Sequence, residues 1–113
     1  MKSGRPGRKV APMTFAKFSE AVAGAENVPP AGVSGARAAL WHDARGDWEV
    51  AHNAAQADKS KAGAWVHAYL HRKEGDEGNA GYWYSLAGRR MPAKGVALAA
   101  EWEAIARALS DEA

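Results

Sequence analysis

The sequence predicts an all-α protein of about six helices in stacked antiparallel helical hairpins, with no sheet. No segment of the 113-residue chain alternates apolar and polar residues with a period of two. Several segments instead repeat apolar residues at helical spacing between capping residues. A short pattern, His-x3-Gly-Asp-x3-Ala, also occurs twice, and an offset of 29 residues is close to the shortest periods of helical repeats.

The two copies of this pattern lie at 40–51 and 69–80. In each copy a glycine stands where a left-handed residue ends one helix, and an aspartate follows where an N-cap begins the next. A Gly-Asp connection is too short for anything but an antiparallel helical hairpin. We therefore expect two such hairpins stacked on each other.

The other helices follow from caps and apolar spacing. Thr14 is a candidate N-cap for the first helix, Asp58 or Ser60 for the fourth, and Pro92 is a residue that favours the start of the last. Apolar residues on one stripe support the last helix, including Leu98 and Ile105. The helices are expected at about 15–23, 34–45, 48–56, 61–74, 77–87 and from 92 onward.

Charge divides the chain into a flexible basic tail, 1–12, and one helical domain, 13–110. Residues 1–10 hold four basic residues and no acid, which leaves eleven basic against thirteen acidic residues in the rest. Four charges are few for a nucleic-acid arm, so a solvated N-terminus is favoured and nucleic acid is not an expected partner.

Because no apolar run approaches the ~18 residues of a membrane span, we expect a soluble, cytoplasmic protein without a membrane partner.

The absence of cysteine excludes disulfides, thiolate metal sites and a thiol nucleophile. Metal-protease, phosphate-loop and serine-hydrolase motifs are also missing, so the sequence leaves open whether the protein is an enzyme. Arg89 and Arg90 follow a helix end. They are candidates for gripping an anion, although the negative end of the helix dipole also accounts for them.

The block 65–84, WVHAYLHRKEGDEGNAGYWY, resembles that of a family of small, uncharacterised bacterial and fungal all-α proteins. The resemblance covers roughly 40–90, and it implies no catalytic residue. The family carries Arg-Arg after its YWY, where this chain has Ser85 and Leu86. The hairpin pattern is also loosely similar to tetratricopeptide-type repeats.

Histidines supply the candidate metal ligands. His67, His71 and Glu74 fall within about 60° of one another on the fourth helix, and imidazoles four residues apart can bind one metal ion. If the third and fourth helices pack antiparallel, His52 supplies a third ligand. A set of His52, His67 and His71 would suit zinc or iron(II), as a metal-binding protein or a metal-dependent enzyme.

A binding module is the first functional prediction, with the metal protein as its alternative. Helical hairpins would present a groove to a peptide or small ligand, lined by His52, Gln56, His67, His71, Arg72, Glu74 and Tyr82. Consecutive aromatic residues fan around the fifth helix, so Trp83 and Tyr84 are assigned to the core and Tyr82 to the outside.

A structural interpretation competes with both predictions. Ser60, Gly63, His67, His71 and Glu74 form the only polar stripe on the fourth helix, as a solvent-facing edge would. His71 also has a repeat counterpart in His42, which favours a structural role near a helix end. His52 and His67 have no such counterpart, and the sequence therefore indicates them as the better functional candidates.

Overall fold

A computed structural model describes residues 12–111, and within that range the protein contains six α-helices and no strand. This confirms the all-α prediction. The helices run in the order α1 (Phe15–Ala23), α2 (Gly35–Ala44), α3 (Trp48–Ala57), α4 (Lys61–Lys73), α5 (Glu77–Ala87) and α6 (Leu98–Leu109).

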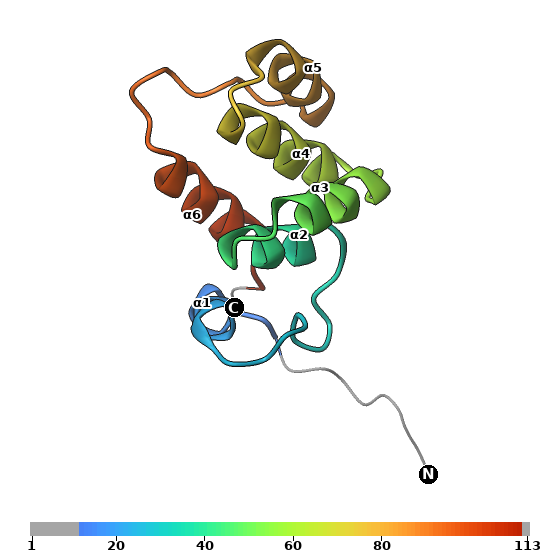
Figure 1. Cartoon of the computed structure of the whole chain (residues 1–113), viewed down its shortest axis with the longest axis vertical. Helices are drawn as coiled ribbons and strands as arrows, with labels where there is room; N and C mark the ends of the chain where they lie inside the picture. The colour runs from blue at the N-terminus through green and yellow to red at the C-terminus, as the bar shows by residue number, and fades with distance from the viewer. Residues whose placement is uncertain (1–11, 112–113) are drawn as a thin grey trace.

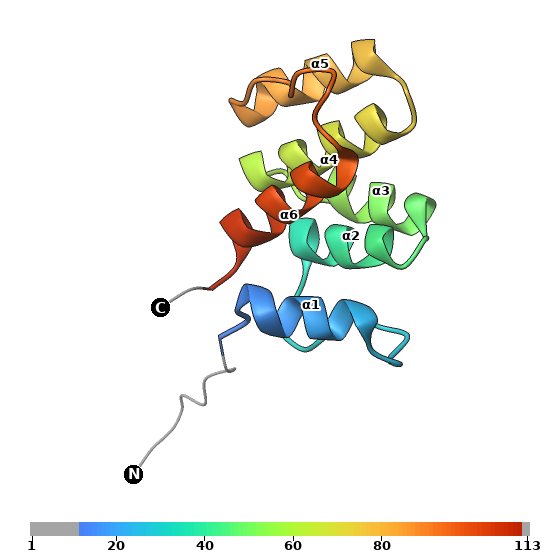
Figure 2. The same cartoon turned by 90° about the vertical axis from the view of Figure 1, so that its left-hand side faces the viewer.

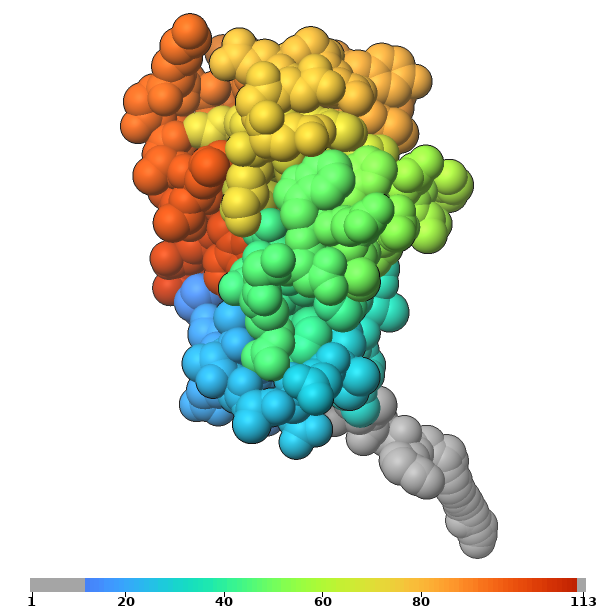
Figure 3. All heavy atoms as spheres, in the orientation of Figure 1, coloured from blue at the N-terminus to red at the C-terminus, as the bar shows by residue number. Residues whose placement is uncertain are grey.

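The helices form layers along one axis (Figures 1 and 2). Helix α1 lies at one end, the antiparallel pair α2 and α3 follows, and α4 and α5 form the far end. Helix α3 packs on α4, which joins the two hairpins, and α6 runs along the side of the stack against α2 and α4. In a space-filling view the layers keep this order, with α6 beside them (Figure 3). The likeness to tetratricopeptide-type repeats stays a prediction.

The two hairpin turns have matching hydrogen bonds, as the internal repeat predicts. The Asp47 amide donates to the His42 carbonyl at 3.0 Å, and the amide of Asp76 donates to the carbonyl of His71 at 2.9 Å. Gly46 and Gly75 adopt left-handed φ values of 86° and 87°. Each aspartate then caps the next helix through its side chain, with acceptor distances of 3.2 Å in both turns.

Asp58 joins three helix ends at one point. Its carboxylate accepts hydrogen bonds from the Ala36 amide at 2.9 Å and from the amide and hydroxyl of Ser60 at 3.0 and 2.6 Å. Burial opposes ionisation of this carboxyl, but these hydrogen bonds outweigh it and lower the pKa of Asp58. Ser60 in turn caps α4 by accepting from the Gly63 amide at 3.2 Å. The end of α3 and the starts of α2 and α4 are thereby held together.

The core lies between the hairpins and α6. It is built from large side chains among many alanines: Phe18, Leu40, Trp41, Val66, Leu70, Tyr84 and Ile105. Tyr84 is buried as expected, and Tyr82 is 60% exposed on the outer face of α5. Trp83, which the sequence assigned to the core, is only half-buried, and its ring is stacked on a histidine.

The prediction that Pro92 begins the last helix is wrong. Residues 89–97 are a connection without helix, in which the Val96 amide donates to the Ala93 carbonyl at 3.0 Å in a turn, and α6 begins at Leu98. Because the chain must travel from the end of α5 to the flank of α4, it needs an extended segment here. Gly95 within the turn also disfavours helix.

The two ends of the described chain are tied together. The Asp111 amide donates to the Met13 carbonyl at 2.9 Å, and the Met13 amide donates to the Asp111 carboxylate at 3.1 Å. Apart from Pro12, the expected basic tail lies outside the described residues.

Among residues 12–111, no helix has the length and apolar character required to cross a membrane.

Candidate metal centre

Three of the four histidines meet where the hairpins join. His52 comes from α3, and His67 and His71 come from α4, one turn apart. The Nε2 atoms of His52 and His67 are 3.0 Å apart, and each of the three rings offers a nitrogen within 4.8 Å of the others. We refer to His52, His67 and His71 as the histidine cluster. The fourth histidine, His42, lies outside it.

The cluster is enclosed, because α3 covers the polar side of α4. His67 is 3% exposed and His71 is 7% exposed, while His52 is half-buried. The interpretation of this stripe as a solvent-facing edge is therefore wrong for its central residues. The 29-residue repeat accounts for the position of His71 in its hairpin turn, yet His71 also belongs to the cluster with the two histidines that the repeat does not explain.

Two tryptophans hold the imidazole rings in place. Trp48 stacks on His52 with centroids 4.9 Å apart, and Trp83 stacks on His67 at 3.9 Å. The Trp48 indole N–H is fixed in turn by donating to the Leu70 carbonyl at 3.1 Å. Neither tryptophan was among the site residues predicted from the sequence. The four-residue spacing from Trp48 to His52 was a usable signal, whereas the position of Trp83 depends on how α5 packs on α4.

Glu74 orients the third histidine. Nδ1 of His71 lies 2.6 Å from the Glu74 carboxylate, which can accept a proton from it, and in a neutral imidazole that donates through Nδ1 the lone pair is on Nε2. Histidines that bind metals commonly donate their other ring nitrogen to a carboxylate in this way. Glu74 therefore acts as a positioning residue for His71.

The surroundings of His52 and His67 favour neutral imidazoles, which are the form that binds metal. Burial, followed by the proximity of His52 and His71, lowers the pKa of His67 to about 4. Burial also lowers the pKa of His52, with a further contribution from His71 that Glu74 partly opposes. At neutral pH the lone pairs of His52 and His67 are thus available without loss of a proton.

One atom of the cluster lacks a partner. Nδ1 of His67 is buried and has no hydrogen bond among the described residues. A buried polar atom without a partner is uncommon in folded proteins and costs about 1–3 kcal/mol. Because Nε2 of His67 is the nitrogen that faces His52, a metal ion bound between these rings would leave Nδ1 without a partner.

The separations are close to those of a bound zinc ion. Two imidazole nitrogens at 2.0–2.1 Å from zinc under a tetrahedral angle lie about 3.4 Å apart. The Nε2 atoms of His52 and His67, now 3.0 Å apart, would move slightly apart on zinc binding. Any other pair of ligand nitrogens is at most 4.8 Å apart and would approach by at most about 1.4 Å, which side-chain rotations can provide. The backbone holds the three imidazole rings near one point.

The remaining predicted site residues lie apart from the cluster. Gln56 lines a cavity of about 260 Å³ that also touches Trp83. Arg72 projects toward α6, where it pairs with Glu101 at 2.8 Å and donates to the Val96 carbonyl. Tyr82 is exposed on α5, with its ring edge-on to Trp83 at 5.2 Å. The structure thus brings together four of the seven predicted residues: His52, His67, His71 and Glu74.

A second group of possible ligands is weaker. His71, Glu74 and Asp76 also offer atoms within 4.8 Å of one another. Both acids are exposed, and each already has a structural role, since Glu74 binds His71 and Asp76 caps α5. The buried histidine cluster is the stronger candidate.

Comparison of the chain with protein-family profiles, curated proteins and solved structures finds no match. The resemblance of the 65–84 block to a family stays an expectation, and the geometry of the histidine cluster is what indicates a function.

Proposed function

We propose that the protein binds a first-row transition metal ion, zinc or iron(II), through His52, His67 and His71. The convergence of three imidazoles from two hairpins, with their ligand atoms within 4.8 Å of one another, carries this proposal. Imidazole nitrogens suit zinc and iron, and three protein ligands leave a position for water or a substrate. The orientation of His71 by Glu74 gives the set a supporting carboxylate.

Zinc titration of the metal-free protein by calorimetry tests the proposal. We expect one zinc ion per chain. Removing a positioning group costs about 10–100-fold in metal affinity, so His52→Ala and His67→Gln should each weaken binding by at least about 100-fold and Glu74→Gln by about 10–100-fold. Elemental analysis of protein purified without added metal would identify the ion that is bound on isolation.

His42→Ala is the matched control, since it removes the one histidine outside the cluster. It should bind zinc as the unmodified chain does. If His67→Gln unfolds, His52→Ala still tests the proposal. His52 is only half-buried, so its removal should disturb the fold less. Equal affinities for His42→Ala and His52→Ala, or no binding by the unmodified chain, would refute the metal centre.

Binding of a small organic ligand beside the cluster is a second candidate, favoured by one observation. The cavity of about 260 Å³ that touches Trp83 is rimmed by the polar residues Gln56, Lys59 and Lys61. A ligand there would contact the ring that is stacked on His67. A library of small polar compounds, screened for a rise in melting temperature that Gln56→Ala abolishes, tests this candidate.

A further inference from the structure

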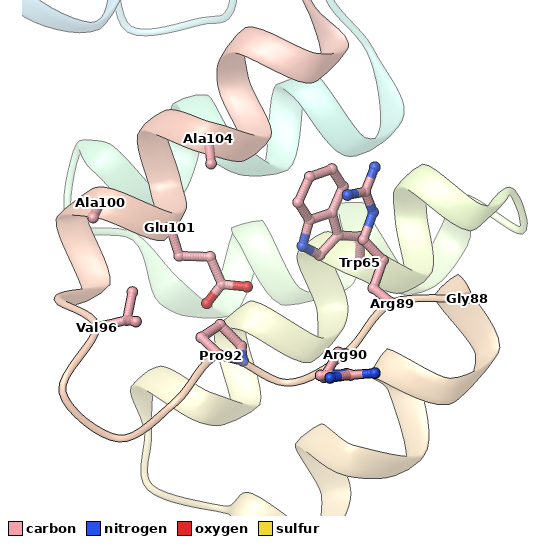
Figure 4. A pocket seen from close by; sticks show the side chains of 9 residues that line it. All are labelled: Trp65, Gly88, Arg89, Arg90, Pro92, Val96, Ala100, Glu101 and Ala104. Atoms are coloured by element: carbon pink, nitrogen blue, oxygen red, sulfur yellow. The ribbon is translucent and has the colours of Figure 1, made fainter.

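Away from the histidine cluster, a pocket lies between α4, α6 and the 89–97 connection (Figure 4). Its volume is about 410 Å³, within the range of small-molecule sites. Apolar groups form most of its wall, including Trp65, Pro92, Ala100 and Ala104. The two arginines that follow α5, Arg89 and Arg90, contribute its charge.

The guanidinium groups are available for a ligand. The guanidinium of Arg89 lies 3.5 Å above the centroid of Trp65, which fixes its plane and leaves the N–H groups at its edge free. Within residues 12–111, neither Arg89 nor Arg90 pairs with a carboxylate or donates a side-chain hydrogen bond to a carbonyl of α5. The dipole of α5 therefore does not hold them through direct contacts.

Glu101 is the one acid in the wall, and its charge is already balanced. Its carboxylate accepts from Arg72 at 2.8 Å and from the hydroxyl of Tyr84 at 2.6 and 2.8 Å. The ammonium of Lys61 adds positive charge nearby, since it lies 3.9 Å from the position that a Cβ atom would occupy at Gly88. The pocket consequently combines an apolar wall with a net positive rim.

We propose that this pocket binds a small organic anion, with its apolar body against Trp65 and its oxyanion on Arg89 and Arg90. Planar guanidinium groups match both carboxylates and phosphates through paired hydrogen bonds. Carboxylates and phosphate monoesters therefore share the chemistry that the rim recognises. This site does not depend on the metal centre.

Calorimetric titration with 2-naphthoate and 2-naphthyl phosphate tests the proposal, with the uncharged 2-naphthamide as the matched probe. We expect a Kd of about 0.1–1 mM for the better anion, from the usual affinity per ligand atom. The amide should bind at least about tenfold more weakly than that anion. Tighter binding of the phosphate would identify phosphate monoesters as the class, and tighter binding of 2-naphthoate would identify carboxylates.

Three variants separate the pocket from general charge effects. Arg89→Gln and Arg90→Gln should each weaken anion binding at least about fivefold, and Ala104→Phe should block both anions by filling the pocket. Arg107→Gln is the control, because Arg107 likewise stacks on an aromatic ring, that of Phe15 at 4.0 Å, but lies outside the pocket. His67→Gln should have no effect.

Equal affinity for 2-naphthoate and 2-naphthamide would overturn the proposal. So would undetectable binding of both anions, or an Arg107→Gln variant that loses as much affinity as Arg89→Gln.

Discussion

His67 shows how its neighbours alter the chemistry of a single side chain. The residue lies between the ring of Trp83 and the other two histidines, almost without contact with water. A charged imidazole is disfavoured there because it would be poorly solvated and would repel any protonated neighbour. The same conditions that lower its pKa make His67 a good metal ligand and a poor structural cation.

The lowered pKa predicts a stability that depends on pH. His67 has a pKa of about 4 in the folded chain and about 6.5 when unfolded, so the unfolded state binds more protons between these values. The free energy of unfolding of the metal-free protein should therefore fall as the pH drops through this window. Between pH 7 and pH 5 the loss that is due to His67 should be about 1–2 kcal/mol.

Denaturant unfolding at the two pH values, compared with the same measurement on His67→Phe, isolates this contribution. Phenylalanine keeps an apolar ring against Trp83 and cannot take up a proton, so the variant should lose less stability on acidification. His42→Ala should behave like the unmodified chain. If His67→Phe and the unmodified chain lose the same amount, the imidazole is not held neutral by its surroundings.

The hairpin turn is the element that the sequence specifies most completely. A left-handed glycine and a capping aspartate each have a local physical role, and both copies place them with the same hydrogen bonds. A Cβ atom added at Gly46 or Gly75 would meet no atom within 4 Å. The cost of an alanine there comes from the backbone conformation alone.

Gly46→Ala and Gly75→Ala should therefore destabilise the protein by similar amounts, about 1–2 kcal/mol each. Gly78→Ala provides the control, since Gly78 lies inside α5 with no steric neighbour and without a left-handed φ. It should stabilise by about 0.5–1 kcal/mol, because alanine favours helix over glycine. Denaturant titration measures all three, and clearly unequal losses at the two turns would contradict their equivalence.

Local signals predicted the helices better than the connections between them. Thr14, Ser60 and Asp76 cap helices as expected, because an N-cap acts within one turn. The start of α6 was misplaced, since residues 89–97 are shaped by the distance that they must span. Helical spacing put His67 and His71 on one face, and the antiparallel hairpins brought His52 to them.

The burial of that face and the packing of Trp83 against it could not be predicted from the sequence. A polar stripe on an apolar helix is typical of a solvent-facing edge, and only the packing of α3 on α4 shows that this one is enclosed. The stacking of Trp83 on His67 and of Arg89 on Trp65 depends on side-chain contacts between separate elements. No spacing within one helix encodes such contacts.

At the scale of the whole molecule, a buried polar network attaches α6 to the stack. The pair of Arg72 and Glu101 is almost fully enclosed, and the hydroxyl of Tyr84 completes the surroundings of the carboxylate. A second buried carboxylate, that of Asp43, pairs with Lys73 at 2.8 Å. These contacts join α2, α4, α5 and α6 across the interior.

Arg72→Met should destabilise the protein by about 3–5 kcal/mol, because it leaves the carboxylate of Glu101 buried without its cation. Arg107→Met is the matched control, since the pair of Arg107 and Glu103 is exposed and worth about 0–1 kcal/mol. Denaturant unfolding of both variants at neutral pH makes the comparison. Losses of equal size would show that the buried pair contributes no more to stability than the exposed one.

A metal ion at the histidine cluster would join the two hairpins, because its ligands come from α3 and α4. Diffraction from crystals grown with zinc, measured on both sides of the zinc absorption edge, would locate the ion directly. We expect one anomalous peak about 2.0–2.1 Å from a ring nitrogen of each of His52, His67 and His71. A zinc-containing crystal without a peak at these rings, or with its peak on Glu74 and Asp76 instead, would contradict the proposed metal centre.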